Sequence, residues 1–533
     1  MIGNVSAGAV HPLAAGAVTT TEDKPAPEVP DTPDAPDKPE APAAPDRPAA
    51  KEPAGRQLVD ELYIQLDQQA DLREIERLPV GQERVTRAVD ELRRTATRSQ
   101  DDLLEGIRSR IQRSGAPLEV EVGERLWINN SMTVQVYQDP SKGNLPFEGG
   151  AEKVASMLSE VPGVVGAYSV DKLRFDVPPV ESFRANGQRP LDDARSGAAG
   201  AQPGALPWNL EMIGVQSAWD AGITGAGVTV ASLDTGVDVR HPALWSKYRG
   251  YDRTDGFRHE QNYFDAYGDS KQPGQPHAEP VDDNGHGTHV TGTIVGNDGF
   301  TGPVGVAPGA QFIAARGLGS EGGSTLDLLR GMQYLMAPVD DWGQGDARQA
   351  ASIINHSWGG PGPSLEFTSA IRNMAKAGIV NVFAAGNSGY ARPTQTLGDP
   401  GMQTEGITVG AVDRHGDVAP FSSTGPSNVS DELKPFVVAP GVDIVSSVPD
   451  GKYEALSGTS MAAPHVTGAL ALVNEALAKR GQSGLDLRDA KFVLERMVRD
   501  VDVPGPDDRT GHGLIDLTRM DEAIDALVGK RAG

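Results

Sequence analysis

Short apolar runs that alternate with helical stretches constrain the fold of residues 207–525 more than any other feature of the chain. The runs cover residues 228–233, 312–315, 352–354, 379–385 and 407–412. Runs of this length with little polar alternation are typical of strands buried on both faces, as in a parallel sheet covered by helices. The sequence therefore predicts one large α/β domain, with a mostly parallel sheet and helices on both of its faces.

The N-terminal part of the chain divides by composition. Residues 1–56 are rich in Ala, Pro and Asp, and a proline occupies every third position from 27 to 48. Because polyproline II has three residues per turn, we expect a disordered, extended arm, for which a plain linker and a Pro-x-x-Pro ligand both stay open. Residues 57–115 mix charged and apolar side chains, with helical spacing from Val85 to Ile111, and predict a helical segment.

A small domain and a linker follow the helical segment. Residues 116–180 have strand-like alternation, then a helical stretch, then a second strand-like run, and predict an α+β domain. Residues 181–206 are rich in Arg, Gly, Ala and Pro, as an exposed linker is. We expect cleavage to occur there, and we expect residues 526–533 to form a short tail after the large domain.

Charge and composition exclude several classes of function. The chain of 533 residues carries a formal charge of −25, which disfavours binding to nucleic acid or anionic membranes. It has no cysteine, so disulfides, thiolate metal sites and a catalytic thiol are excluded. No stretch approaches the roughly 18 to 20 apolar residues that span a bilayer.

Three polar side chains stand where a sheet of this kind gathers its ligands. Asp234 ends the apolar run 228–233, and His286 lies between glycines at the start of a predicted helix. Ser460 begins an apolar helix, where free N–H groups and the helix dipole favour a developing anion. A serine there is more often an N-cap than a nucleophile, but the joint occurrence of the three groups favours chemistry.

Together these groups can activate a hydroxyl. A neutral imidazole takes the proton of the serine, and a buried carboxylate fixes the imidazole tautomer and stabilises its charged form. The run 380–385 leads into Gly386 and Asn387, whose amide can donate a hydrogen bond to an oxyanion.

Four motifs occur in the order of a known family. They are Asp234-Thr235-Gly236, His286-Gly287-Thr288-His289, Ala385-Gly386-Asn387 and Gly458-Thr459-Ser460-Met461-Ala462-Ala463-Pro464-His465. With this order the chain resembles the subtilisin-like serine peptidases. The segments Trp127-Ile128-Asn129-Asn130, Trp208-Asn209-Leu210-Glu211-Met212-Ile213-Gly214 and Asn355-His356-Ser357-Trp358-Gly359-Gly360 point to the bacillopeptidase F type within that family.

The resemblance implies a role for each polar residue. Asp234 would orient His286, which would act as general base and then as general acid, while Ser460 would form the acyl-enzyme. Asn387 and the Ser460 N–H would hold the oxyanion. In the family the first histidine of the His-Gly-Thr-His unit does the chemistry, so His289 would be a packed helix residue. A metal pair of His286 and His289 is the competing idea, but it lacks the glutamate of the zinc peptidase pattern. No metal or cofactor is expected for the chemistry, although structural calcium, frequent in the family, stays open.

The substrates implied are proteins or peptides, bound as an added strand along exposed edges. The residues expected to bind them are Ser357, Trp358, Gly359, Gly319, Gly322, Gly323, Ala384, Ala385 and Gly386. Residues 116–180 are similar to the family's propeptide, an intramolecular inhibitor that is cut off in the linker.

Three functions are therefore weighed. A self-processing, secreted serine endopeptidase is favoured over an intracellular, cytoplasmic processing peptidase with a dedicated partner, since self-inhibition is useful before export. Residues 1–20 nevertheless lack the basic start of a signal peptide. A catalytically dead scaffold is disfavoured because every member of the triad is present.

Overall fold

The computed structural model describes residues 56–138, 150–175, 206–267, 279–299, 302–340, 343–391 and 394–532. All of them belong to one compact unit, residues 55–533. The predicted arm lies outside the described residues apart from Arg56, and the predicted linker apart from Leu206.

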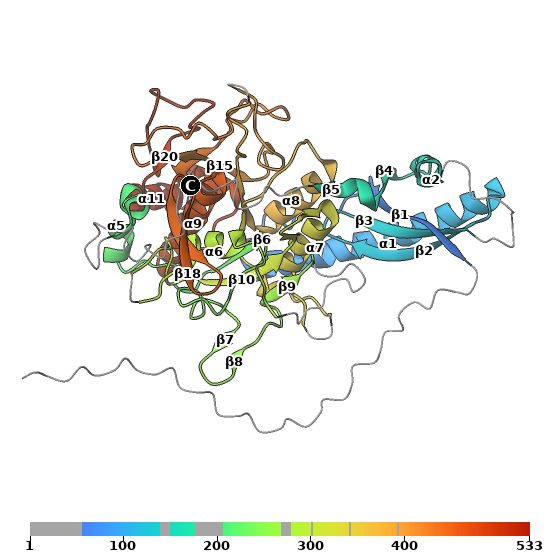
Figure 1. The fold of residues 1–533 in the computed structure, drawn as a ribbon, viewed down its shortest axis with the longest axis horizontal. Helices are drawn as coiled ribbons and strands as arrows, with labels where there is room; N and C mark the ends of the chain where they lie inside the picture. The colour runs from blue at the N-terminus through green and yellow to red at the C-terminus, as the bar shows by residue number, and fades with distance from the viewer. Residues whose placement is uncertain are drawn as a thin grey trace, which may run out of the picture. The chain divides into compact units, whose positions relative to one another are not determined.

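The large domain is built on a nine-stranded sheet (Figure 1). In spatial order its strands are β19 (Val498–Arg499), β20 (Leu514–Ile515), β16 (Val437–Pro440), β15 (Ile407–Val412), β14 (Val380–Ala384), β13 (Ile353–His356), β6 (Thr229–Asp234), β10 (Gln311–Arg316) and β9 (Tyr263–Asp265). Every neighbouring pair is parallel except β19 and β20. The prediction of a mostly parallel sheet is confirmed.

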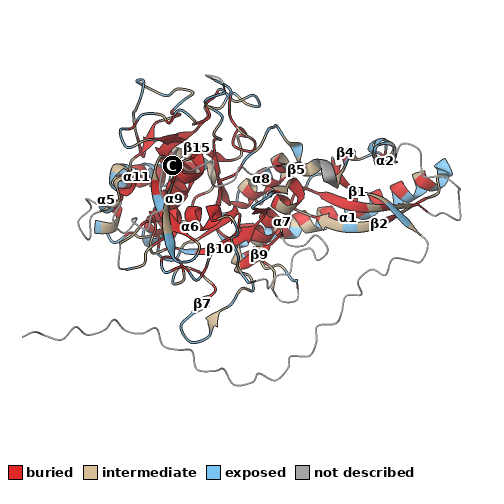
Figure 2. Cartoon of the chain, viewed as in Figure 1, coloured by how far each residue is buried: buried red, intermediate tan, exposed pale blue. Residues whose placement is uncertain are grey.

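Helices cover both faces of this sheet, because successive side chains of each strand point to opposite sides. On β6, Val230 packs into the core shared with α6 (His286–Val295), α9 (Thr459–Lys479), α10 (Leu487–Leu494) and α11 (Met520–Ala532). Its neighbour Ala231 packs into the core shared with α7 (Thr325–Met336) and α8 (Leu365–Ala377). Figure 2 shows that the sheet and the inner sides of the helices are buried.

Shorter elements complete the large domain. They are α4 (Trp208–Met212), α5 (Val215–Asp220), β7 (Tyr251–Asp252), β8 (Gly256–Phe257), β11 (Leu318–Gly319), β12 (Gly322–Ser324), β17 (Ile444–Val448), β18 (Lys452–Leu456) and the 3-10 turns η4 (Ala347–Gln349) and η5 (Leu517–Arg519).

The N-terminal domain is an antiparallel sheet of four strands with two helices. Its elements are β1 (Gln57–Leu66), α1 (Gln82–Ser114), β2 (Leu118–Leu126), β3 (Ser131–Gln138), α2 (Gly150–Ser159), β4 (Val164–Ser169), η2 (Val170–Leu173) and β5 (Arg174–Phe175). The sheet order is β2-β3-β1-β4, so β1 is an inner strand.

Two expectations about secondary structure are wrong. Residues 57–66 form strand β1, although the helical segment was predicted from residue 57. In the second half of β1 both sides are buried, because Ile64 packs into the domain's own core and Tyr63 into the core shared with α7 and α8. Residues 526–532, predicted as a tail, belong to α11, whose Leu527 is buried in the large domain.

In the described part of the chain, no helix combines the length and the hydropathy that a membrane span needs.

Candidate active site

Asp234 and His286 meet where a strand ends beside the start of a helix. Asp234 is the last residue of β6, and His286 is the first of α6. The Nδ1–H of His286 donates to Oδ1 of Asp234 over 2.7 Å, and both side chains are buried. Gly287 permits this approach, since a Cβ there would lie 2.1 Å from the carbonyl oxygen of Gly236.

The ion pair sets the protonation behaviour of the imidazole. Burial alone would lower the pKa of His286, but the charge of Asp234 and its hydrogen bond outweigh burial and raise this pKa above its ordinary value. The carboxylate therefore favours the imidazolium form, and by accepting from Nδ1 it leaves Nε2 as the atom that can take a proton.

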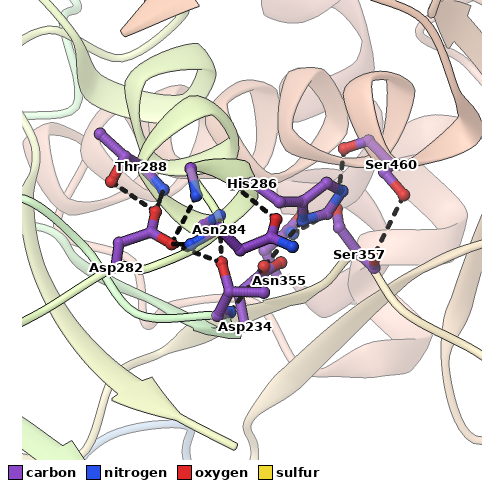
Figure 3. Close-up of polar contacts among 11 residues, drawn as sticks. Asp234, Asp282, Asn284, His286, Thr288, Asn355, Ser357 and Ser460 are labelled. Carbon is purple, nitrogen blue, oxygen red and sulfur yellow. Dashed lines mark hydrogen bonds and ion pairs between the residues drawn. The ribbon is translucent and has the colours of Figure 1, made fainter. Parts of the chain in front are cut away.

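Asp282 organises the loop that leads into His286, and the sequence reasoning missed it. Its Oδ1 accepts from the hydroxyl of Thr235 at 2.8 Å and from the N–H groups of Asn284 and Gly285 at 3.2 and 2.8 Å. Its Oδ2 accepts from the N–H and hydroxyl of Thr288 at 2.8 and 2.6 Å. One carboxylate thus binds five donors around the N-terminus of α6 (Figure 3).

Ser460 lies in the first turn of α9. Its Oγ–H donates to the carbonyl of Ser357 over 3.0 Å, and the Ser357 hydroxyl donates to the Ser460 carbonyl over 2.8 Å. Asn355 donates to the Ser357 hydroxyl over 2.8 Å, which joins the end of β13 to α9. Figure 3 shows the imidazole of His286 between Asp234 and Ser460.

Asn387 follows the end of β14, after Gly386 with its φ of 105°. Its Oδ1 accepts from the N–H of Thr459 at 2.9 Å and from the Thr459 hydroxyl at 3.0 Å. Because Oδ1 accepts from these two donors, the NH₂ group is the part of the Asn387 amide that can donate a hydrogen bond elsewhere.

Comparisons with known proteins agree with this arrangement. The Subtilase family profile matches residues 225–513, more than half of the chain. The chain belongs to the subtilase family.

Three relatives indicate how far this likeness extends. Bacillopeptidase F of Bacillus subtilis (strain 168) is 37% identical over 338 residues, 62% of this chain and 23% of that protein. The major intracellular serine protease of the same organism is 35% identical over 60% of this chain and 89% of its own length. Subtilisin Savinase of Lederbergia lenta is 35% identical over 51% of this chain and 85% of its own length. The chain thus spans about a quarter of the length of bacillopeptidase F.

The nine residues expected to bind substrate lie in three segments of this subtilase. Ser357, Trp358 and Gly359 follow β13, while Ala384 ends β14 and Ala385 and Gly386 follow it. Gly319 ends β11, and Gly322 and Gly323 lie in β12. The Trp358 ring is buried and packs against Phe367 and Phe383, with centroids at 5.3 and 6.5 Å.

The edge of β12 is already paired with another strand of the same chain. The last described strand of the N-terminal domain, β5, pairs with it antiparallel, Phe175 opposite Gly323 and Arg174 opposite Ser324. An edge predicted to bind an extended peptide therefore binds an extended part of the same chain.

The other histidines near the triad are held apart from it. His289 is buried, its Nε2 contacts the carbonyl of Ile444 at 2.9 Å, and burial lowers its pKa to about 3. His465 donates from Nδ1 to the carbonyl of Met461 and accepts at Nε2 from Asn209, both at 2.8 Å. Asn209 was also missed as a partner of α9, because nothing in its local sequence marks a contact 256 residues away.

Proposed function

We propose that this subtilase is a serine endopeptidase that hydrolyses peptide bonds of proteins through an acyl-enzyme on Ser460. The observation that carries the proposal is the 2.7 Å bond from His286 Nδ1 to Asp234, with Ser460 on the other side of the imidazole. The complete triad disfavours the scaffold alternative.

Acylation follows from the arrangement of these groups. His286 Nε2 takes the proton of Ser460 as its Oγ attacks the scissile carbonyl, and Asp234 stabilises the imidazolium that forms. The imidazolium then donates this proton to the leaving amine. Water repeats the sequence on the ester, with the same imidazole as base and then as acid, and restores Ser460.

The negative charge of the tetrahedral intermediate needs its own donors. We assign this role to the NH₂ group of Asn387 and the N–H of Ser460, at the N-terminus of α9. The hydrogen bonds from Thr459 fix the amide of Asn387 before substrate arrives, so no reorganisation is needed when the charge develops.

Substrate recognition is proposed to rest on backbone pairing. An extended peptide would pair with β12, where Gly322 and Gly323 leave room for a second backbone, and Ala384, Ala385 and Gly386 would line the pocket for one side chain.

We also propose that the chain is a self-processing zymogen. The pairing of β5 with β12 supports this, because the N-terminal domain then takes the strand position that a substrate needs. Cleavage within residues 181–206 would break the covalent link between the two domains.

Two further points belong to the proposal. We favour export, because self-inhibition is useful before a protease is released from the cell. The cytoplasmic alternative is supported by a relative whose name describes it as intracellular. The proposed chemistry needs no cofactor, and structural calcium would show as a fall in Tm when the mature enzyme is treated with a chelator.

The test compares the full chain with its Ser460→Ala variant. The native chain is expected to shorten at residues 181–206, to hydrolyse a protein substrate and to react with a serine-directed phosphonate, whereas the variant does none of these. A folded native chain that is neither labelled nor active after removal of the N-terminal domain would contradict the proposal. A chain that is active but never cuts itself would contradict only the zymogen part.

A further inference from the structure

A row of charged residues crosses three neighbouring strands at the edge of the sheet that carries the triad. Arg316, the last residue of β10, is the register partner of Asp234 on β6 and of Asp265 on β9. Its guanidinium donates to Asp265 over 3.0 Å and to Asp283 over 2.8 Å. The Arg316 side chain is only 9% exposed and that of Asp265 11%, so their contact is made largely away from water, whereas Asp283 is 44% exposed.

The loop of residues 281–285, which leads into His286, packs around this arginine. Its Asp282 forms an antiparallel bridge with Gly236, and its Val281 carbonyl accepts from the N–H of Val237 at 3.2 Å. A Cβ on Gly236 would lie 3.3 Å from Cδ of Arg316, so the stem of the arginine lies against this bridge.

Arg316 is itself held firmly. Its carbonyl accepts from the N–H groups of Ala266 and Tyr267 at 2.8 and 3.2 Å, and its guanidinium lies 4.9 Å from the centre of the Tyr267 ring. Because the guanidinium is fixed and binds Asp283, it can hold the loop at that residue. Asp283 is next to Asp282 in the sequence and three residues before His286.

We propose that Arg316 is a positioning residue for the proteolytic reaction, which holds the His286 loop against the strand neighbouring Asp234. This inference rests on the proposed function. Arg316 touches neither substrate nor reacting atoms in this role, since it acts through Asp283 and the loop of residues 281–285.

The charges around the imidazole give a second readout. The titratable groups that act on His286 are Asp234 on β6, Asp282 in the preceding loop and His289 on its own helix. In the same region Arg316 forms ion pairs with Asp265 and Asp283. Loss of that cation leaves a more negative surrounding, which raises the pKa of His286. Because the base must be neutral, the acidic limb of kcat/KM then moves to higher pH.

The experiment uses the mature enzyme with Arg316→Met, Arg316→Lys and the control Arg249→Met. Arg249 is also partly buried and binds Asn262 and the carbonyl of Gln349, and its hydrogen bonds to the described residues include none to the loop of residues 281–285. For Arg316→Met we expect kcat to fall by roughly 10- to 100-fold, with KM within about threefold, since a small misplacement of the base affects the chemical step. Its acidic limb should move up by roughly 0.3 to 1 unit. Arg316→Lys should recover part of both effects, and Arg249→Met should change neither.

Unchanged kcat and pH profile in a folded Arg316→Met enzyme would overturn the inference, as would an equal loss in Arg249→Met. If Arg316→Met fails to fold, Asp283→Asn replaces it, because this carboxylate is 44% exposed and its loss is tolerable to the fold. It should lower kcat about threefold to tenfold, and an unchanged kcat would overturn the inference. An inactive wild-type enzyme would instead mean that the proposed function has failed.

Discussion

The N-termini of α6 and α9 begin in the same way but are used differently. Both helices start after a glycine that offers no side-chain cap, Gly285 and Gly458. At α6 the carboxylate of Asp282 binds the nearby N–H groups. At α9 the N–H of Thr459 is bound by Asn387, whereas the N–H of Ser460 has no acceptor among the described residues.

This difference between the two helix N-termini distinguishes a structural use of the free N–H groups from a use in the reaction. A helix N-terminus carries free donors and partial positive charge, which can bind either a protein carboxylate or an anion that forms during reaction. The start of α6 is occupied by the chain itself, so the contribution that we propose for it is the side chain of His286. At the start of α9 the N–H of Ser460 is left without an acceptor among the described residues, and under the proposed function it would bind the oxyanion of the intermediate.

The largest change in kcat should come from Asp234→Asn, which removes the carboxylate that binds His286 at the start of α6. The asparagine cannot stabilise the imidazolium and no longer fixes the tautomer, so kcat should fall by about 10⁴-fold, a magnitude known from the corresponding substitution in a serine peptidase of the chymotrypsin fold. The acidic limb should also move to lower pH, because the charge that raises the pKa of His286 is gone. Rate measurements across pH on mature enzyme test both effects, and an upward shift of the limb would contradict the assignment.

The next largest change in kcat should come from Asn387→Leu, which removes the proposed oxyanion donor at the start of α9. Loss of one oxyanion donor costs roughly 10²- to 10³-fold in kcat, a value measured on subtilisin. KM should stay nearly constant, since the interaction forms only in the transition state. Steady-state kinetics on a peptide substrate would decide, and a rise in KM at constant kcat would assign Asn387 to substrate binding instead.

Asp282→Ala tests whether the carboxylate at α6 is mainly structural. Five donors lose their acceptor, so the free energy of unfolding should fall by about 3 kcal/mol, with a drop in kcat of about tenfold. The neighbouring Asp283→Ala is the matched control and should cost under about 1 kcal/mol, because its carboxylate is partly exposed. Denaturant titration of both variants measures this, and equal losses would remove the distinction between the two carboxylates.

Thr459→Val should have the smallest effect. It removes one of the two hydrogen bonds that fix Oδ1 of Asn387, and keeps the backbone donor. We expect kcat to fall only about three- to tenfold, as for one neutral hydrogen bond. A loss as large as that of Asn387→Leu would mean that the hydroxyl itself has a direct role in the reaction.

The sequence predicts the sheet and the triad for physical reasons that are local. Five neighbouring strands of the sheet are short apolar runs, namely β6, β10, β13, β14 and β15. Asp234, His286 and Ser460 each stand at the boundary of a strand or helix beside glycine or other small residues. Such boundaries are visible in single segments, without knowledge of what packs against them.

The features that were missed depend on contacts between distant segments. In β1, Leu62, Ile64 and Leu66 pack into the core of the N-terminal domain, whereas Tyr63 packs into the core shared with α7 and α8. The apolar run 62–64 therefore hides the period of two, and the clear helical spacing from Val85 onward was extended back over the strand. Asp282 and Asp283 are adjacent carboxylates that nothing local distinguishes, yet one binds the N-terminus of α6 and the other Arg316.

The pairing of β5 with β12 has a consequence for competition between substrate and inhibitor. Under the proposed zymogen mechanism, the N-terminal strand of the intact chain would meet this edge as a tethered ligand, and tethering can give effective concentrations of about millimolar. A free protein substrate at a lower concentration would then not displace it. After cleavage the same strand would compete only at its bulk concentration, so dilution would shift the balance toward substrate.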